Sequence, residues 1–153
     1  MDKIDATLLS ILKENARTPV KAMTNRVFLS APAISARIEK LERQGVIKGY
    51  HAAIDNIKLG YHITAFISLN ALPSVEPEFY EFISACPNVI ECNCVTGDFS
   101  MLIKVAFPSA MELNTFVNQL QRFGVTSTQF VFSTPVEHRS LEVCPEEGAA
   151  RSK

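Results

Sequence analysis

Residues 31–44 combine small and cationic side chains in a spacing that suits contact with a nucleic acid. At about 100° per residue, Ala36, Lys40 and Arg43 fall on one side of a helix, opposite an apolar stripe that begins at Ile34 and recurs at i+4 and i+7. Small side chains let such a helix approach a DNA groove closely, while Arg and Lys reach phosphates and guanine edges. The pattern predicts a DNA-binding face, although a solvated helix surface carries the same residue types.

The candidate DNA contacts divide by the part of the duplex they would meet. Ser35, Ala36 and Arg37 are best placed for base edges. Phosphate contacts, which supply salt-dependent affinity, are expected from the cations of this helix, Arg37 included, and from one lysine beyond it. The full set of predicted DNA-binding residues is Ser30, Ser35, Ala36, Arg37, Lys40, Arg43 and Lys48.

Two further helices are expected ahead of this one. Residues 2–15 carry an apolar stripe behind Asp2, which suits an N-cap. Thr18 is predicted to cap a second helix, with Pro19 in its first turn, and Ser30 to cap the third. Two short capped helices joined by a tight turn indicate a helix-turn-helix, with the first helix packed against the pair.

A short β-ribbon is predicted after the third helix. Gly45 suits the position just past a helix end, and residues 46–54 form two short extended pieces. Three helices and a ribbon make a winged helix-turn-helix. Lys48 and His51 would then contact phosphate, or the ribbon would serve only to fix the third helix in place.

Charge divides the chain into two parts. The 153 residues carry a net charge of −1, but residues 1–60 hold ten Lys and Arg against six Asp and Glu, whereas residues 61–153 hold five against ten. A basic part suits a polyanion and an acidic part suits another task. With 47% hydrophobic residues the chain has enough apolar material for one domain or two small ones.

The second half changes from helical periodicity to alternation. Strands are predicted from Tyr61, Val89, Phe99 and Val125, the last running to Thr134, with a helix between the first two and another between the last two. Ser109 and Glu112 form a capping box for the later helix, which Gly124 is expected to end. This βαββαβ order predicts a ferredoxin-like antiparallel sheet with both helices on one face.

Such a sheet leaves its other face open. Side chains that helices would not cover are expected among Phe66, Leu102, Cys92 and Phe130 or Phe132. Pairing of two sheets across a two-fold axis would bury them and would set two DNA-reading helices about one turn of DNA apart. The sequence therefore predicts a homodimer.

Other functional classes find little support. The four cysteines lack the paired spacing of a zinc site, and no nucleophile with a base and an orienting group is evident, so we expect no metal, no cofactor and no enzyme activity. Cys92 and Cys94 fall on the same side of a predicted strand and are interpreted as buried, reduced thiols. No apolar run is long enough for a membrane span, and a cytoplasmic protein is expected.

Several segments together resemble the Lrp/AsnC family of leucine-responsive and asparagine-responsive regulators. The resemblance covers residues 1–143 and is carried by Asp2-Lys3-Ile4-Asp5, Leu8-Leu9, Asn15-Ala16-Arg17, Leu29-Ser30, the run from Arg37 to Tyr50, and Thr96-Gly97-Asp98-Phe99. It implies an α+β protein: a winged helix-turn-helix domain with its linker over residues 1–60 and a ferredoxin-like (RAM-type) effector domain over residues 61–143. Residues 144–153 are expected to be a disordered tail. Members of this family form dimers, often octamers, and bind amino acids between dimers.

Two departures from the family pattern concern function. Phe28 stands in the turn where the family usually has Gly, and Ser100 stands where a second carboxylate usually follows the Gly-Asp turn. A carboxylate there could hold the ammonium group of an amino acid. The predicted effector contacts are Gly97, Asp98 and Ser100 from the turn, with Ser133 and Thr134 at the end of the last strand.

These observations predict a sequence-specific, DNA-binding transcriptional regulator tuned by a small amino acid or related metabolite. An architectural protein of the same fold, which wraps DNA without a ligand, is the alternative that the missing carboxylate favours. A third reading is a winged helix that binds only proteins.

Overall fold

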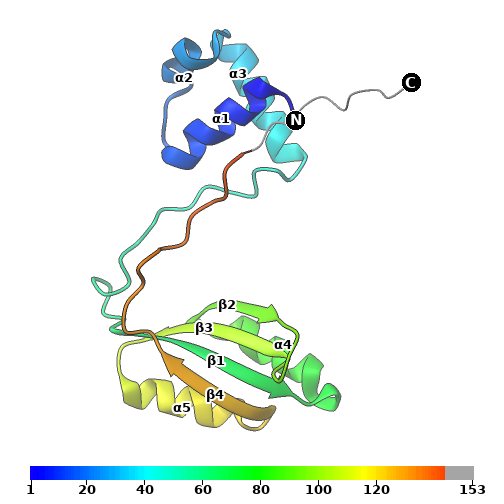
Figure 1. Cartoon of the computed structure of the whole chain (residues 1–153), viewed down its shortest axis with the longest axis vertical. Helices are drawn as coiled ribbons and strands as arrows, with labels where there is room; N and C mark the ends of the chain where they lie inside the picture. Colours follow the sequence, from blue (N-terminus) through cyan, green and yellow to red (C-terminus); the bar gives the residue numbers. More distant parts are fainter. Residues whose placement is uncertain (144–153) are drawn as a thin grey trace. The chain divides into compact units, whose positions relative to one another are not determined.

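The computed structural model of the protein describes residues 1–143, so the predicted disordered tail at 144–153 lies outside the described residues. The chain divides into two compact units, Met1–Ala53 together with the segment from Glu137, and Ile54–Val136. Figure 1 shows the first unit as a helical cluster and the second as a sheet with helices. Each unit is described by itself below.

The helical unit contains the predicted three helices. They are α1 (Lys3–Glu14), α2 (Val20–Val27) and α3 (Ala31–Arg43). Asp2 caps α1 by accepting a hydrogen bond from the Asp5 backbone N–H, as predicted. The unit has its own apolar core, to which every helix contributes: Leu8, Ile11, Met23, Val27 and Ile34.

The capping predicted for α2 is wrong. Its N-cap residue is Pro19, which has no side-chain donor or acceptor, and Thr18 instead donates its hydroxyl hydrogen to the Asn15 carbonyl. Ser30 does occupy the N-cap position of α3, but its hydroxyl makes no capping hydrogen bond. The start of α2 therefore relies on the fixed backbone angle of proline and on packing.

The second unit is built on a four-stranded antiparallel sheet with the order β2-β3-β1-β4, which confirms the ferredoxin-like prediction. Its elements follow the βαββαβ order: β1 (Ile63–Ala71), η1 (Pro73–Val75), α4 (Glu76–Ala85), β2 (Val89–Cys94), β3 (Met101–Phe107), α5 (Ala110–Leu120) and β4 (Gly124–Phe130). Ser109 caps α5 and contacts Glu112, as predicted.

Both helices of this unit cover the same face of the sheet (Figure 1). The core lies between them and holds the fully buried Phe79 of α4, Leu120 of α5 and Ile67 of β1. The alternation in β1 thus sets which side chains enter the core, because neighbouring residues of a strand point to opposite faces.

Gly124 starts β4 rather than ending α5, which corrects the sequence-based assignment. A Cβ atom at this position would lie 1.9 Å from the Asn70 carbonyl oxygen, so the close approach of β4 to β1 requires glycine. β4 ends at Phe130, four residues before the predicted end at Thr134.

The open face of the sheet differs in part from the prediction. Phe66 and Leu102 lie on it, as expected, because their neighbours along β1 and β3 are the buried ones. Cys92 does not, since it is paired with Ile103 and packs against the helix-covered core. Phe130 is opposite Ala65 and shares its helix-covered side, and Phe132 lies beyond the strand with its side chain fully exposed.

Candidate nucleic-acid interface and effector site

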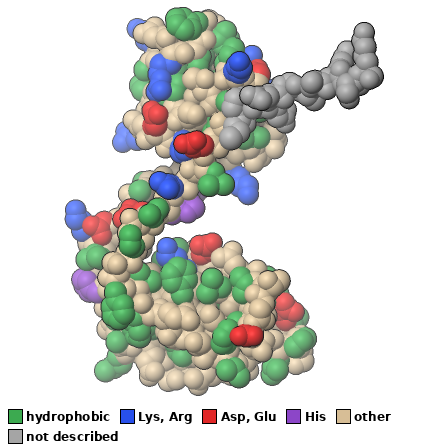
Figure 2. All heavy atoms as spheres, in the orientation of Figure 1, with side chains coloured by type: hydrophobic (Ala, Val, Ile, Leu, Met, Phe, Trp, Pro, Cys, Tyr) green, Lys and Arg blue, Asp and Glu red, His purple; other side chains and the backbone are tan. Residues whose placement is uncertain are grey.

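The outer face of α3 presents two cations from a helix that is buried on its other side. Ile34 and Leu41 are buried, whereas Ala36, Lys40 and Arg43 are exposed. Lys40 has no ion-pair or hydrogen-bond partner within residues 1–143. Figure 2 shows Lys and Arg side chains spread over the visible surface of the helical unit. Lys40 can therefore meet a polyanion without first breaking a contact within the described chain.

Arg43 is held only weakly. Its guanidinium lies 3.8 Å from the Glu39 carboxylate one turn earlier, and both side chains are more than three-fifths exposed. Exposed pairs of this spacing contribute about 0.3–0.5 kcal/mol, so a phosphate can replace Glu39 at little cost. Ser35 is half-buried on the edge of the same face, and the Ser30 hydroxyl at the start of α3 is not used in capping.

Arg37 occupies a different place. It lies on the flank of α3, and its guanidinium donates to Asp2 Oδ2 and to Asp5 Oδ1, each at 2.6 Å. Because Asp5 is buried and the Arg37 side chain is only 32% exposed, this cation fixes the start of α1 against α3. A base contact by Arg37 would require these ion pairs to open, so that role stays a prediction.

The folded protein stabilises the charged forms of Arg37 and Asp2. Hydrogen bonds to Asp2 and then to Asp5 raise the pKa of Arg37. The pKa of Asp2 is lowered, first by the backbone hydrogen bond from Asp5 and then by Arg37. Both groups are therefore ionised throughout the physiological pH range, which suits a structural ion pair.

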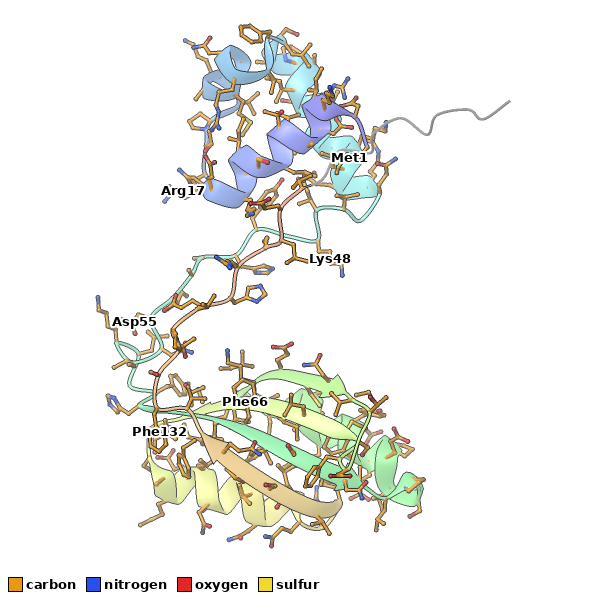
Figure 3. The ribbon with its side chains drawn as sticks, in the orientation of Figure 1. Met1, Arg17, Lys48, Asp55, Phe66 and Phe132 are labelled. Atoms are coloured by element: carbon orange, nitrogen blue, oxygen red, sulfur yellow. The ribbon has the colours of Figure 1, made fainter. Side chains whose placement is uncertain are left out.

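The wing predicted after α3 is not formed. Residues 46–62, all within the described part of the chain, contain no strand. Gly45 has φ of +69° and ends α3, and the Val46 N–H donates to the Leu41 carbonyl, the hydrogen bond expected beyond a glycine-ended helix. Lys48 lies on this segment, which is not a two-stranded β-ribbon (Figure 3). Its proposed phosphate contact therefore lacks the expected β-scaffold.

One side chain ties this segment back to α3. The Tyr50 hydroxyl donates to Glu42 Oε1 at 2.8 Å. Burial, followed by this contact with Glu42, raises the pKa of Tyr50 to about 12. The pair fixes the chain on leaving the helix, which is the positioning task that a wing was expected to perform.

The turn between β2 and β3 holds three of the predicted effector contacts, but one of them is already engaged. Ser100 Oγ accepts a hydrogen bond from the Ala71 N–H at 3.0 Å and donates to the Leu69 carbonyl at 3.3 Å. Asp98 is exposed, and Gly97 has φ of +123°. Asp98 is the only one of the three whose side chain could bind an ammonium group, because the Ser100 hydroxyl is used to fasten β1.

The structure does not bring Ser133 and Thr134 to this turn. β4 runs antiparallel to β1, so the end of β4 lies where β1 begins, whereas Ser100 contacts the end of β1. Six residue steps of strand separate the two ends, roughly 20 Å at about 3.3 Å per residue. Within one chain the two predicted halves of the effector site cannot line one pocket.

Comparison with known proteins agrees with both units. The AsnC-type helix-turn-helix domain matches residues 1–42, and the Lrp/AsnC ligand binding domain matches residues 64–141. An uncharacterised HTH-type transcriptional regulator of Bacillus subtilis is 35% identical, with 90% of this chain and 98% of the relative covered. The HTH-type transcriptional regulator LrpB of Bacillus subtilis is 32% identical, with 81% and 83% covered.

A solved structure has the same fold. A transcriptional regulator from Neisseria meningitidis, crystallised as an L-Met complex, superposes with a TM-score of 0.84 over 95% of this chain and 96% of the other at 24% identity. A helix-turn-helix joined to a ferredoxin-like sheet domain defines a class of DNA-binding transcriptional regulators. Within that class, the chain belongs to the Lrp/AsnC family.

Within the part of the chain that the structure describes, no helix is both long and apolar enough to cross a membrane. No group of three His, Cys, Asp or Glu side chains among residues 1–143 is arranged to hold a metal ion.

Proposed function

We propose that the outer face of α3 is the surface through which this regulator reads duplex DNA, with Ala36 and Ser35 against base edges and Lys40 and Arg43 on phosphates. The observation that carries this assignment is the exposure of both cations on a helix whose opposite side is buried. Neither is held by a buried partner, so binding DNA breaks no buried ion pair and at most the exposed Arg43–Glu39 contact. Ser30 extends the face at the start of α3.

A matched pair of lysine variants tests this surface. Lys40→Ala is expected to weaken binding to every duplex alike, because a phosphate contact carries no sequence information. Lys58→Ala is the control, since Lys58 is exposed in a turn of the other unit. Fluorescence anisotropy with a labelled duplex measures both. Equal affinities of the two variants would refute the assignment of α3.

We propose further that two copies pair through the open face of the sheet. Phe66 and Leu102 lie half-buried on this face, and Val125, which is opposite Asn70 on the same face, is 71% exposed. The Lys104 ammonium lies 5.8 Å from the Phe66 ring centroid. This cation covers part of the Phe66 ring and leaves the other apolar side chains of the open face uncovered. A second copy would bury these side chains and bring two α3 helices to one duplex.

Sedimentation equilibrium tests the pairing. Leu102→Lys places a charge on the open face, whereas Met111→Lys does so at an exposed apolar position on α5, where Met111 is 80% exposed. We expect Leu102→Lys to reduce the assembly to single chains and Met111→Lys to leave its mass unchanged. Equal masses for the two variants would place the contact elsewhere. Assembly into octamers is a further prediction that the wild-type mass checks.

We propose that a free amino acid is the effector, with Asp98 holding its ammonium group. Support comes from the match to a ligand binding domain and from the L-Met complex of the structural relative. Because Ser133 and Thr134 lie at the other end of the sheet, they would join such a site only from another chain. Such a site would be completed by assembly, which links ligand binding to oligomer size.

Calorimetry against L-Met and a panel of other amino acids tests this effector. Asp98→Asn is expected to weaken binding at least tenfold, because it removes a charge-assisted hydrogen bond. Ser100→Ala is the control and is expected to bind as the wild type does, since the Ser100 hydroxyl is fastened to β1. Absence of binding by all amino acids would favour the alternative of an architectural protein that needs no ligand.

These roles require neither a bound cofactor nor an enzymatic site, and a regulator that acts on DNA is expected in the cytoplasm.

A further inference from the structure

Two sulfur atoms are in contact where β2 ends beside β3, and a third lies two residues earlier on the same side of β2. Cys94 Sγ lies 3.5 Å from Met101 Sδ, on the residue directly opposite it across the strand pair. Cys92 precedes Cys94 by two residues and is paired with Ile103, so both thiols point to the helix-covered side. β2 is one of the two edge strands of the sheet, with α4 alongside it (Figure 1).

These sulfur atoms differ in their access to solvent. Met101 is 3% exposed and Cys92 is half-buried, whereas Cys94 is exposed. Packing accounts for Cys92 and Met101, which contact the core, but not for an exposed thiol placed against a thioether. The arrangement instead offers soft donors with one open side.

A polar group stands beside the exposed thiol. The Tyr80 hydroxyl of α4 lies 3.3 Å from Cys94 Sγ and 2.7 Å from Glu76 Oε1. The single phenol hydrogen is donated to Glu76 in this structure, so the Cys94 thiol donates to the Tyr80 oxygen. Once the thiol has lost its proton, the phenol hydrogen can turn to the thiolate, as partners of metal ligands commonly do.

We propose that Cys92, Cys94 and Met101 form a site for a soft monovalent metal ion, Cu(I). Two thiolates and a thioether select soft ions. Zinc also binds thiolates, but it takes four ligands drawn from Cys, His and carboxylate and not a thioether, so a three-sulfur set that includes Met101 favours Cu(I). Two sulfur atoms that share an ion at about 2.3 Å lie about 3.5–4 Å apart, so the Cys94–Met101 spacing requires little movement. Each thiol releases one proton to solvent on binding, and the ion with its two thiolates carries a net charge of −1.

Competition with a coloured Cu(I) chelator under anaerobic conditions tests the site. The parent protein is the full chain with Cys86→Ser and Cys144→Ser, so that the remaining thiols are Cys92 and Cys94. We expect it to hold one Cu(I) per chain and to release two protons. Cys94→Ser in this parent is expected to lower the affinity at least tenfold.

Two further variants separate coordination from packing. Met101→Leu conserves side-chain volume and removes the thioether, and should lower the affinity several-fold with an unchanged circular dichroism spectrum. Tyr80→Phe should lower it about tenfold through loss of the hydrogen bond to the thiolate. If the parent fails to retain Cu(I), or if Cys94→Ser and Met101→Leu both retain it as tightly as the parent does, the proposal is wrong. DNA binding measured on apo protein is unaffected by either result, so the function proposed above stands or falls separately.

Discussion

Replacement of Phe28 by glycine should stabilise the helical unit. Phe28 ends α2 with φ of +55° and ψ of +38°, and within the described chain it is the one residue other than glycine with positive φ. Its side chain is 88% exposed, so burial of the ring contributes little free energy to offset the cost of this backbone conformation. A left-handed conformation costs a residue with a Cβ atom about 1–2 kcal/mol, a cost that glycine avoids.

The expected magnitude follows from three opposing contributions. Phe28→Gly raises the free energy of unfolding by about 1–2 kcal/mol because it relieves the backbone strain. It lowers the same quantity by about 0.4–1 kcal/mol because glycine makes the unfolded chain more flexible, and by about 0.3 kcal/mol because the small buried part of the ring is lost. The net gain in the free energy of unfolding is about 0.5 kcal/mol. Phe28→Ala keeps the strain and loses the ring, so it should fall below the wild type, leaving the glycine variant about 0.5–1 kcal/mol more stable than the alanine variant.

Hydrogen exchange measures this difference in the helical unit alone. The Leu8 and Ile11 amides belong to the core helix α1, so their slowest exchange reports unfolding of this unit in the full chain. These amides should exchange about two- to fivefold more slowly in Phe28→Gly than in Phe28→Ala, the factor that about 0.5–1 kcal/mol predicts. Equal rates in the two variants would refute the argument from backbone strain.

Three further predictions concern side chains already engaged. Arg37→Leu should lower the free energy of unfolding of the helical unit by about 2 kcal/mol, because the buried Asp5 carboxylate loses its cation; an unchanged urea midpoint would contradict this. Ser100→Ala should cost about 1 kcal/mol in thermal unfolding, since the Ala71 N–H loses its acceptor, and no loss would mean that water replaces the hydroxyl. Tyr50 should ionise near pH 12, so the stability that its raised pKa contributes is complete below pH 10 and is lost as the pH rises toward 12. Glu42→Gln should bring its absorbance titration closer to pH 10, and an unshifted curve would assign the effect to burial alone.

The periodicity of the sequence predicted most of the fold because each element carries its own pattern. Alternation in β1 and the capping box at Ser109 are local signals, and both elements formed as expected. The β-ribbon predicted at residues 46–54 does not form, and the reason is related. β-branched residues such as Val46 and Ile47 favour extended backbone, but a strand also needs a partner, which no local pattern supplies.

The candidate site was harder to predict because it depends on contacts between distant residues. The pairing of Arg37 with Asp2 spans 35 positions and exists only because α1 packs against α3. The helical pattern placed Arg37 beside the exposed face but could not show which carboxylates it meets. Likewise, the positions of Ser100 and Ser133 at opposite ends of the sheet follow from strand order, which alternation does not specify.

The salt dependence of duplex binding tests most directly whether α3 meets DNA through its outer face in two paired copies. Each phosphate contact contributes about 0.9 to the slope of log affinity against log salt concentration, so two copies of Lys40→Ala should lower the magnitude of that slope by about 1.8. Lys58→Ala should keep the wild-type slope. A wild-type slope for Lys40→Ala, or a chain that binds no duplex at low salt, would contradict the account.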